Sequence, residues 1–138
     1  MIIDKEILDE LTLGAKASSR LRLAYDLRNT PEELSQRMLN AIEPGTVVPI
    51  HRHLMSNETV LCVRGHFEEL LYNDEGKLIQ IVDMLPGGNI VNVPIGMWHS
   101  LRSLESGTIV FEAKDGKYEP LEPNDIFTRV RAKRNIFR

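Results

Sequence analysis

Residues 45–65 read GTVVPIHRHLMSNETVLCVRG, with two histidines and a glutamate set between glycines. Alternate side chains of an extended strand share a face, so we expect His51 and His53 to point one way and Arg52 the other. Four residues separate His53 from Glu58, which leaves room for a turn before the next strand. Imidazole and carboxylate ligands suit Zn, Fe, Mn, Ni or Cu better than Mg or Ca. The spacing therefore predicts three ligands of one metal ion.

A second stretch, residues 88–99, reads GNIVNVPIGMWH and ends in a fourth candidate ligand, His99. The chain downstream of residue 36 breaks into short apolar segments separated by Pro, Gly, Asn and Asp, which is typical of an all-β sandwich or barrel. The expected strands are residues 38–43, 59–63, 67–72, 78–84, 90–93, 99–104 and 108–113. Their number suits a jelly roll, which closes two sheets around an interior.

These two stretches resemble the two sequence motifs of the cupin superfamily. The first motif, G-x5-H-x-H-x4-E-x6-G, is matched at every position between Gly45 and Gly65. The second, G-x5-P-x-G-x2-H-x3-N, is matched from Gly88 to His99 and departs only at Ser103, where the family has an asparagine that is not a metal ligand. The resemblance covers roughly residues 36–113 and implies a single cupin jelly-roll β-barrel. It implies a site with three histidines and one glutamate: His51, His53, Glu58 and His99.

A narrower resemblance concerns three segments: residues 36–53 (QRMLNAIEPGTVVPIHRH), residues 98–101 (WHSL) and residues 111–118 (FEAKDGKY). They are similar to the WbuC family of small cupin-fold metalloproteins, whose genes often lie among those for bacterial surface polysaccharide. Members of that family tend to end the last motif in Gly-Pro-Tyr, where this chain has Gly-Lys-Tyr. The likeness implies a metalloprotein of surface polysaccharide biosynthesis.

The flanking segments predict one domain in three parts. Residues 1–35 should form a helix capped by Asp4, a strand within residues 20–28 and a short helix beginning near Pro31, all packed on the barrel. Residues 36–118 are the expected barrel core. Residues 119–138 form an extension with a basic tail of five arginines and lysines, which is either solvated or docks a partner subunit or an anionic ligand.

Composition is that of an ordinary soluble domain. The chain has 138 residues, 42% hydrophobic and 27% charged, with a net charge of -3, which favours neither nucleic acid nor membrane as a partner. Its single cysteine, Cys62, cannot form an internal disulfide and shares the inward face of its strand with Glu58. No signal peptide is evident, so we expect a cytoplasmic protein. Edge strands of small jelly rolls need covering, so we also expect a homodimer.

Three residues outside the motifs are further candidates. Glu112 lies in an apolar strand and is either a general base, a partner that orients a ligand histidine, or half of a salt bridge with Lys114. Trp98 either forms a wall of a substrate pocket or covers the outside of the sheet. Arg37 either binds an anionic substrate or faces solvent. His66, just outside both motifs, is expected to face solvent rather than bind metal.

Two classes of function remain open. The first is an enzyme that uses one divalent transition metal ion (Zn, Fe, Mn or Ni) on a small polar substrate such as a sugar or sugar nucleotide. The expected reaction is isomerisation or epimerisation, in which Glu112 moves the proton. If the bound metal is iron, the alternative within this class is a dioxygenase. The second is a non-catalytic module that binds or senses a small molecule.

Overall fold

The computed structural model describes residues 1–128, and within them the chain forms one α-helix and eight strands. The elements are α1 (Lys5–Ala17), β1 (Arg22–Asp26), β2 (Ser35–Ile42), β3 (Glu58–Arg64), β4 (Phe67–Tyr72), β5 (Leu78–Met84), β6 (Ile90–Val93), β7 (Trp98–Ser103), β8 (Ile109–Asp115) and a 3-10 turn η1 (Pro123–Asp125). No helix in this described part is long and apolar enough to cross a membrane.

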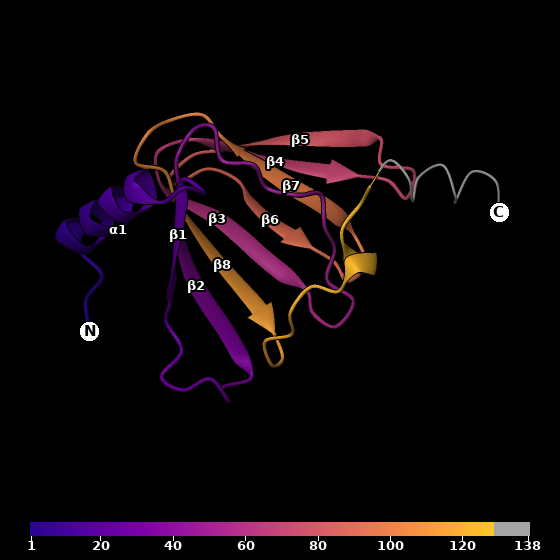
Figure 1. The fold of residues 1–138 in the computed structure, drawn as a ribbon, viewed down its shortest axis with the longest axis horizontal. Coiled ribbons are helices and arrows are strands. Elements are labelled where there is room, and N and C mark those ends of the chain that lie inside the picture. The colour runs from indigo at the N-terminus through magenta and orange to yellow at the C-terminus, as the bar shows by residue number, and fades with distance from the viewer. Residues whose placement is uncertain (129–138) are drawn as a thin grey trace.

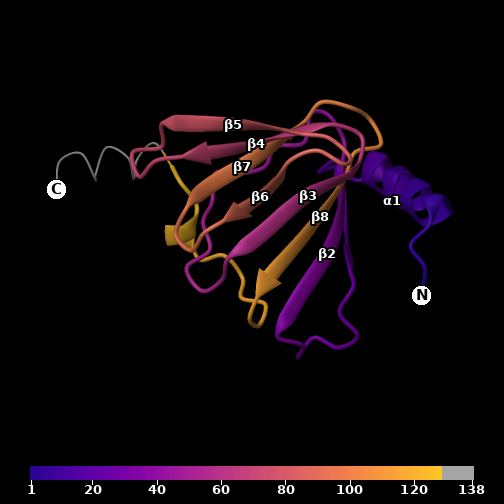
Figure 2. The same cartoon turned by 180° about the vertical axis from the view of Figure 1, so that it is seen from behind.

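The strands form two antiparallel sheets, which confirms the predicted all-β jelly roll. One sheet has the order β1-β2-β8-β3-β6 and the other the order β5-β4-β7. The two sheets face each other, close together near α1 and further apart toward the end where η1 lies (Figure 1), and the view from behind shows the same arrangement (Figure 2). The expected bounds of β4, β5 and β6 are those observed.

The N-terminal helix begins as predicted, with Asp4 as its cap. The carboxylate of Asp4 accepts a hydrogen bond from the backbone N–H of Ile7 at 3.1 Å, which caps the first turn. The helix then continues through Gly14 to Ala17. A Cβ atom on Gly14 would lie 2.5 Å from the side chain of Leu23, so glycine here allows α1 to lie directly against β1.

The short helix expected near Pro31 is not formed, and residues 31–32 make a turn instead. The side chain of Glu33 accepts a hydrogen bond from the backbone N–H of Asn29 at 3.1 Å and pairs with Arg37 at 3.0 Å. Because β2 already begins at Ser35, the carboxylate that would have continued the helix closes the turn instead.

Two apolar cores lie on opposite faces of the larger sheet. Ile42 of β2 belongs to the interior core between the sheets, whereas Leu39 and Ala41 belong to the core under α1. The buried members of the interior core are Ile42, Val60, Cys62, Phe67, Met84, Val91, Val93 and Val110. Cys62 is therefore a core residue, as predicted. Polar residues on the same interior faces form the site described below.

Arg64, at the end of β3, attaches the helix to the sheets. Its guanidinium donates hydrogen bonds to Asp9 Oδ1 at 2.7 Å, to Thr12 Oγ1 at 2.9 Å and to the carbonyl of Leu8 at 3.1 Å. It also donates to the carbonyl of Gly107 at 3.0 Å. A planar guanidinium offers several donors in a fixed geometry, so one side chain links α1 to the loop before β8.

Candidate metal centre

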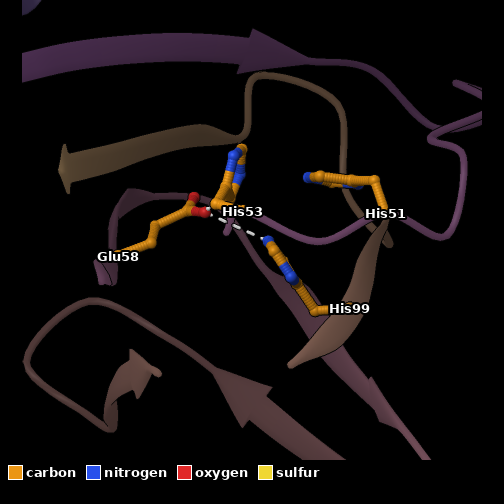
Figure 3. Close-up of side chains that lie close together, drawn as sticks. All are labelled: His51, His53, Glu58 and His99. Atoms are coloured by element: carbon orange, nitrogen blue, oxygen red, sulfur yellow. Dashed lines mark hydrogen bonds and ion pairs between the residues drawn. The ribbon is translucent and has the colours of Figure 1, made fainter. Parts of the chain in front are cut away.

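The structure brings the four predicted ligands together. Each of them offers one nitrogen or oxygen atom, and these atoms all lie within 4.8 Å of one another. His51 and His53 come from the segment before β3, Glu58 is the first residue of β3, and His99 is the second residue of β7. Figure 3 shows the four side chains pointing toward a common space. Glu58 and His99 are buried, whereas His51 and His53 are half-buried, so the cluster faces solvent on their side.

Backbone pairing on both sides aligns the segment that carries the first two histidines. His51 exchanges two backbone hydrogen bonds with His99, at 3.0 and 2.8 Å, and also pairs with Ile126. The C-terminal segment adds a bond from Phe127 N–H to the carbonyl of Ile50 at 2.8 Å and one from Arg52 N–H to the carbonyl of Asp125 at 3.0 Å. The expected extended backbone is therefore held between β7 and a segment that sequence patterns did not place there.

The hydrogen bonds of the imidazole rings leave their Nε2 atoms for the cluster. His51 Nδ1 lies 2.8 Å from the carbonyl of Pro49, and His99 Nδ1 lies 3.1 Å from the carbonyl of Met97. A carbonyl only accepts, so each Nδ1 carries the proton in the neutral ring, and each Nε2 presents a lone pair. Such bonds to backbone carbonyls orient metal-binding histidines in proteins.

The nitrogen and oxygen atoms at the centre fit a cation. His99 Nε2 lies 3.0 Å from Glu58 Oε2, and His53 Nε2 lies 3.1 Å from the same oxygen. His53 Nε2 is nevertheless buried without a hydrogen-bond partner among the described residues. Lone pairs of neutral imidazole and carboxylate repel at this distance unless a proton or a metal ion lies between them. Three imidazoles and one carboxylate are a donor set that transition metals accept.

The electrostatics of the cluster keep His51 and Glu58 in their metal-binding states, whereas His99 holds its proton more tightly until a cation replaces it. Burial, and next the nearby imidazole of His99, lowers the pKa of His51 to about 4, so this ring is neutral at pH 7. Burial alone would raise the pKa of Glu58, but its contacts with His53 and His99 outweigh burial and hold that pKa well below its usual value. Burial would lower the pKa of His99, and the bond to Glu58 outweighs it, so the pKa is raised. A neutral imidazole and an ionised carboxylate are the forms that bind metal.

Glu112 and Lys114 lie beside the cluster on the interior face of β8. Glu112 is opposite Val60 of β3, and Lys114 is opposite Glu58. Lys114 Nζ lies 3.8 Å from Glu112 Oε2, so the salt bridge considered for Glu112 is present as a loose ion pair. Burial, and next the charge of Glu58, raises the pKa of Glu112 to about 7. Glu112 thus contacts Lys114 and lies next to the cluster at the same time.

Glu69, on β4, is a buried carboxyl group that sequence reasoning missed. It is 1% exposed, and its Oε2 atom has no hydrogen-bond partner in the described part of the chain. Burial, followed by the charges of Glu58 and Glu112, raises its pKa well above the usual value. In FEELLY, residues 67, 69 and 71 share one face of the strand, so once that face is known to be the inward one, a charged residue stands between two apolar ones.

The contacts of Trp98 and Arg37 are with residues other than the four of the cluster. Trp98 is 3% exposed, with the guanidinium carbon of Arg52 4.5 Å from its ring centre and the Phe127 ring at 5.4 Å. The Trp98 ring therefore packs against Arg52 and Phe127. Arg37 pairs with Glu33. Substrate contacts of Trp98 and of Arg37 stay predictions. His66 is half-buried and pairs with Asp83. The basic tail lies outside the described residues.

Solved structures with the same fold include three informative ones. KdgF from Halomonas sp. is 20% identical, with a TM-score of 0.55 over 70% of this chain and 82% of that chain. The capsular polysaccharide assembling protein CapF from Staphylococcus aureus is 21% identical, with a TM-score of 0.61 over 80% of this chain and 32% of that chain. An RmlC-like cupin protein from Desulfovibrio desulfuricans is 14% identical, with a TM-score of 0.53 over 70% of this chain and 84% of that chain.

These likenesses show the cupin fold and do not carry an activity, because one fold supports many functions. The chain spans only about a third of CapF. Comparison with curated protein sequences found no match. A family model described as "Domain of unknown function (DUF6016)" matches residues 3–84, more than half of the chain, and this segment includes His51, His53 and Glu58. The chain therefore belongs to the DUF6016 family and has the fold of the cupins.

Proposed function

We propose that His51, His53, Glu58 and His99 bind one divalent transition metal ion (Zn, Fe, Mn or Ni), and that the protein is a metal-dependent enzyme for a small polar substrate. A sugar or sugar nucleotide is the proposed substrate, and isomerisation or epimerisation is the proposed reaction. The observation that carries the proposal is the convergence of four ligand atoms within 4.8 Å. His53 Nε2 supports it, because this buried atom makes no hydrogen bond within the described residues although it lies 3.1 Å from Glu58 Oε2.

The residues around the cluster fit proton transfer on such a substrate. A divalent ion at this position supplies Lewis acidity toward a carbonyl or hydroxyl oxygen. The carboxylate of Glu112, on the interior face beside Glu58, takes the proton from the carbon next to that oxygen and returns it to the product. Lys114, 3.8 Å from Glu112, orients this carboxylate and offers its remaining N–H donors to a substrate oxygen.

We further propose a cytoplasmic homodimer that works in surface polysaccharide biosynthesis. The free, buried thiol of Cys62 is compatible with a reducing compartment. Edge strand β5 exposes Leu78, Ile79 and Ile81, which a second copy of the chain would cover. CapF, which shares the fold, makes polysaccharide precursors a reasonable first panel of substrates.

Metal content tests the first half of the proposal. We would purify the protein without an affinity tag or added metal and measure bound elements by mass spectrometry. The wild type should carry close to one metal ion per chain, and the double variant His51→Ala/His53→Ala should carry none. His66→Ala is the matched control, because this histidine pairs with Asp83 outside the cluster, and it should keep its metal. A wild type that is empty and takes up no added divalent metal would contradict the proposal.

Isotope exchange tests the second half. The metal-loaded protein would be incubated in D2O with aldoses, ketoses and nucleotide sugars, and deuterium entering a carbon position would be followed by NMR. Glu112→Gln should abolish the exchange while the metal content stays unchanged, because the amide cannot accept the proton. Glu68→Gln, a change at the surface pair with Arg102, should have no effect. Metal binding without exchange on any substrate would favour the non-catalytic binding module.

A further inference from the structure

Glu69 is a carboxyl group for which the described chain provides no partner. It is among the largest fully buried side chains, at 1% exposure. Within residues 1–128 its Oε2 atom accepts no hydrogen bond, and its carboxyl group forms no ion pair. By contrast Glu43, also buried, accepts hydrogen bonds from Ser106 at 2.6 Å and from the backbone N–H of Gly107 at 2.7 Å. Hydrogen bonds therefore compensate for the burial of the Glu43 carboxylate, and no such bond compensates for the burial of Glu69 Oε2.

The strand register places Glu69 on the interior face next to the metal cluster. Phe67, two residues earlier on β4, belongs to the interior core, and Leu71, two residues later, packs against it. Glu69 is opposite Leu101 of β7, and His99 lies two residues along the same face of β7. Such diagonal neighbours are roughly 7 to 8 Å apart. Glu69 therefore approaches the cluster from the three-stranded sheet, which faces β3 and β8 in Figure 1.

The fold itself does not account for a carboxyl group at this position. Phe67, Leu71 and Leu101 around it are apolar, and an apolar side chain of similar size would pack there without any cost of burying polar atoms. Burial and the neighbouring carboxylates raise the pKa of Glu69, which agrees with an acid that lacks a partner within the chain. A buried group that destabilises the fold and lies on the same interior face as the cluster is expected to meet its partner when a ligand is bound.

We propose that Glu69 is a ligand-contacting residue whose carboxyl group binds hydroxyl groups of a polyhydroxylated substrate held at the metal cluster. This inference rests on the proposed function, since it requires a ligand at that cluster. Hydroxyl groups suit the position because each can both donate to and accept from a carboxyl group. A phosphate or carboxylate does not suit it, because Glu58 and Glu112 already make this side of the interior acidic. The end of the substrate that reaches Glu69 is therefore neutral and rich in hydroxyls.

Glu69→Met and Glu69→Gln test the inference, with Glu68→Gln as the matched control on the outward face of the same strand. The probes are D-glucose, D-galactose, D-mannose and D-fructose, observed by saturation-transfer NMR with zinc-loaded protein. We expect at least a tenfold increase in the dissociation constant of the bound sugar for Glu69→Met. A smaller increase is expected for Glu69→Gln, which keeps hydrogen-bonding atoms, and no change for Glu68→Gln. Zinc content should be the same in all variants.

Unfolding in urea provides a readout that does not depend on a ligand. Glu69→Met should unfold at a higher urea concentration than the wild type, because it removes an unpartnered buried carboxyl group. A lower midpoint for both Glu69 variants would show that the carboxyl group stabilises the fold, and would overturn the inference. It is equally overturned if the wild type binds none of the four sugars, or if both variants bind them as the wild type does. A protein that binds no zinc would instead contradict the proposed metal centre itself.

Discussion

Replacing Gly65 with alanine should destabilise the protein far more than the same change at Gly96. Both glycines belong to the cupin motifs, and both have a φ of 84°, in the left-handed region. They differ in what an added Cβ atom would meet. At Gly65 it would lie 2.5 Å from Thr108 Oγ1 and 2.7 Å from the Cα atom of Thr108, whereas at Gly96 nothing lies within 4 Å. The pair therefore separates backbone strain from steric overlap.

The expected magnitudes follow from these two contributions. Left-handed backbone costs a residue with a Cβ atom roughly 1 to 2 kcal/mol, and both variants share this loss. Forcing extra atoms into a packed region adds about 1 to 3 kcal/mol, and this applies to Gly65 alone. Thr108 cannot easily move aside, because it is fully buried and its hydroxyl exchanges 3.2 Å hydrogen bonds with the backbone of His66. We expect a loss of roughly 2 to 5 kcal/mol for Gly65→Ala.

Urea unfolding of the metal-free proteins, followed by circular dichroism, measures the difference. A chelator in all samples removes any contribution from metal binding. Gly65→Ala should unfold at a clearly lower midpoint than Gly96→Ala, with the dependence of the unfolding free energy on urea unchanged in both. Equal midpoints for the two variants would refute the reasoning, because they would show that the loops around residues 65 and 108 separate at no cost.

Three other predictions concern single side chains. Burial raises the pKa of Cys62 to about 11, so at pH 8 only about one thiol in a thousand is ionised. Iodoacetamide should therefore label the protein only when urea unfolds it, and rapid labelling of the native state would contradict this. Arg64→Ala should lower the free energy of unfolding in urea by about 2 kcal/mol, because it removes charge-assisted hydrogen bonds to α1. In the same unfolding assay Arg102→Ala, which changes a surface ion pair, should lower it by less than about 1 kcal/mol. Phe127→Ala removes the ring contact with Trp98 and loosens the segment that pairs with His51. Calorimetry should show a zinc affinity about tenfold lower for this variant, and an unchanged zinc affinity for Val47→Ala, a change at an exposed residue.

Local patterns predicted the strands well because each strand is bounded by residues with strong backbone preferences. Strands β4, β5 and β6 have the predicted bounds. The turn Asn73-Asp74-Glu75-Gly76 separates β4 from β5, and the run Pro86-Gly87-Gly88 separates β5 from β6. The short helix expected near Pro31 did not form, because so short a helix gains little hydrogen bonding and competes with the strand that follows. Pairing of β2 with β8, which joins Ser35 to Asp115, is non-local and left no sequence signal.

The candidate site shows the same division between local and non-local information. Motif spacing singled out the four residues that the structure brings within 4.8 Å. The pairing of His51 with Ile126 could not be predicted, because nothing in the sequence near either residue specifies the other. Glu69 was missed for a different reason: Glu68 and Glu69 are adjacent, and until the inward face of the strand is known, either could be the solvated one.

The pairing of His51 with both His99 and Ile126 has a consequence for how the protein is made. Synthesis on the ribosome proceeds from the N-terminus, so His51, His53 and Glu58 emerge well before β7 and the segment that ends at Phe127. Until those later residues arrive, the backbone bonds that align His51 in the folded protein cannot form. If the cluster binds the proposed metal ion, metal acquisition is then a late event in maturation. The retained ion would reflect the pool that the released, folded chain encounters rather than the pool that the nascent chain encounters.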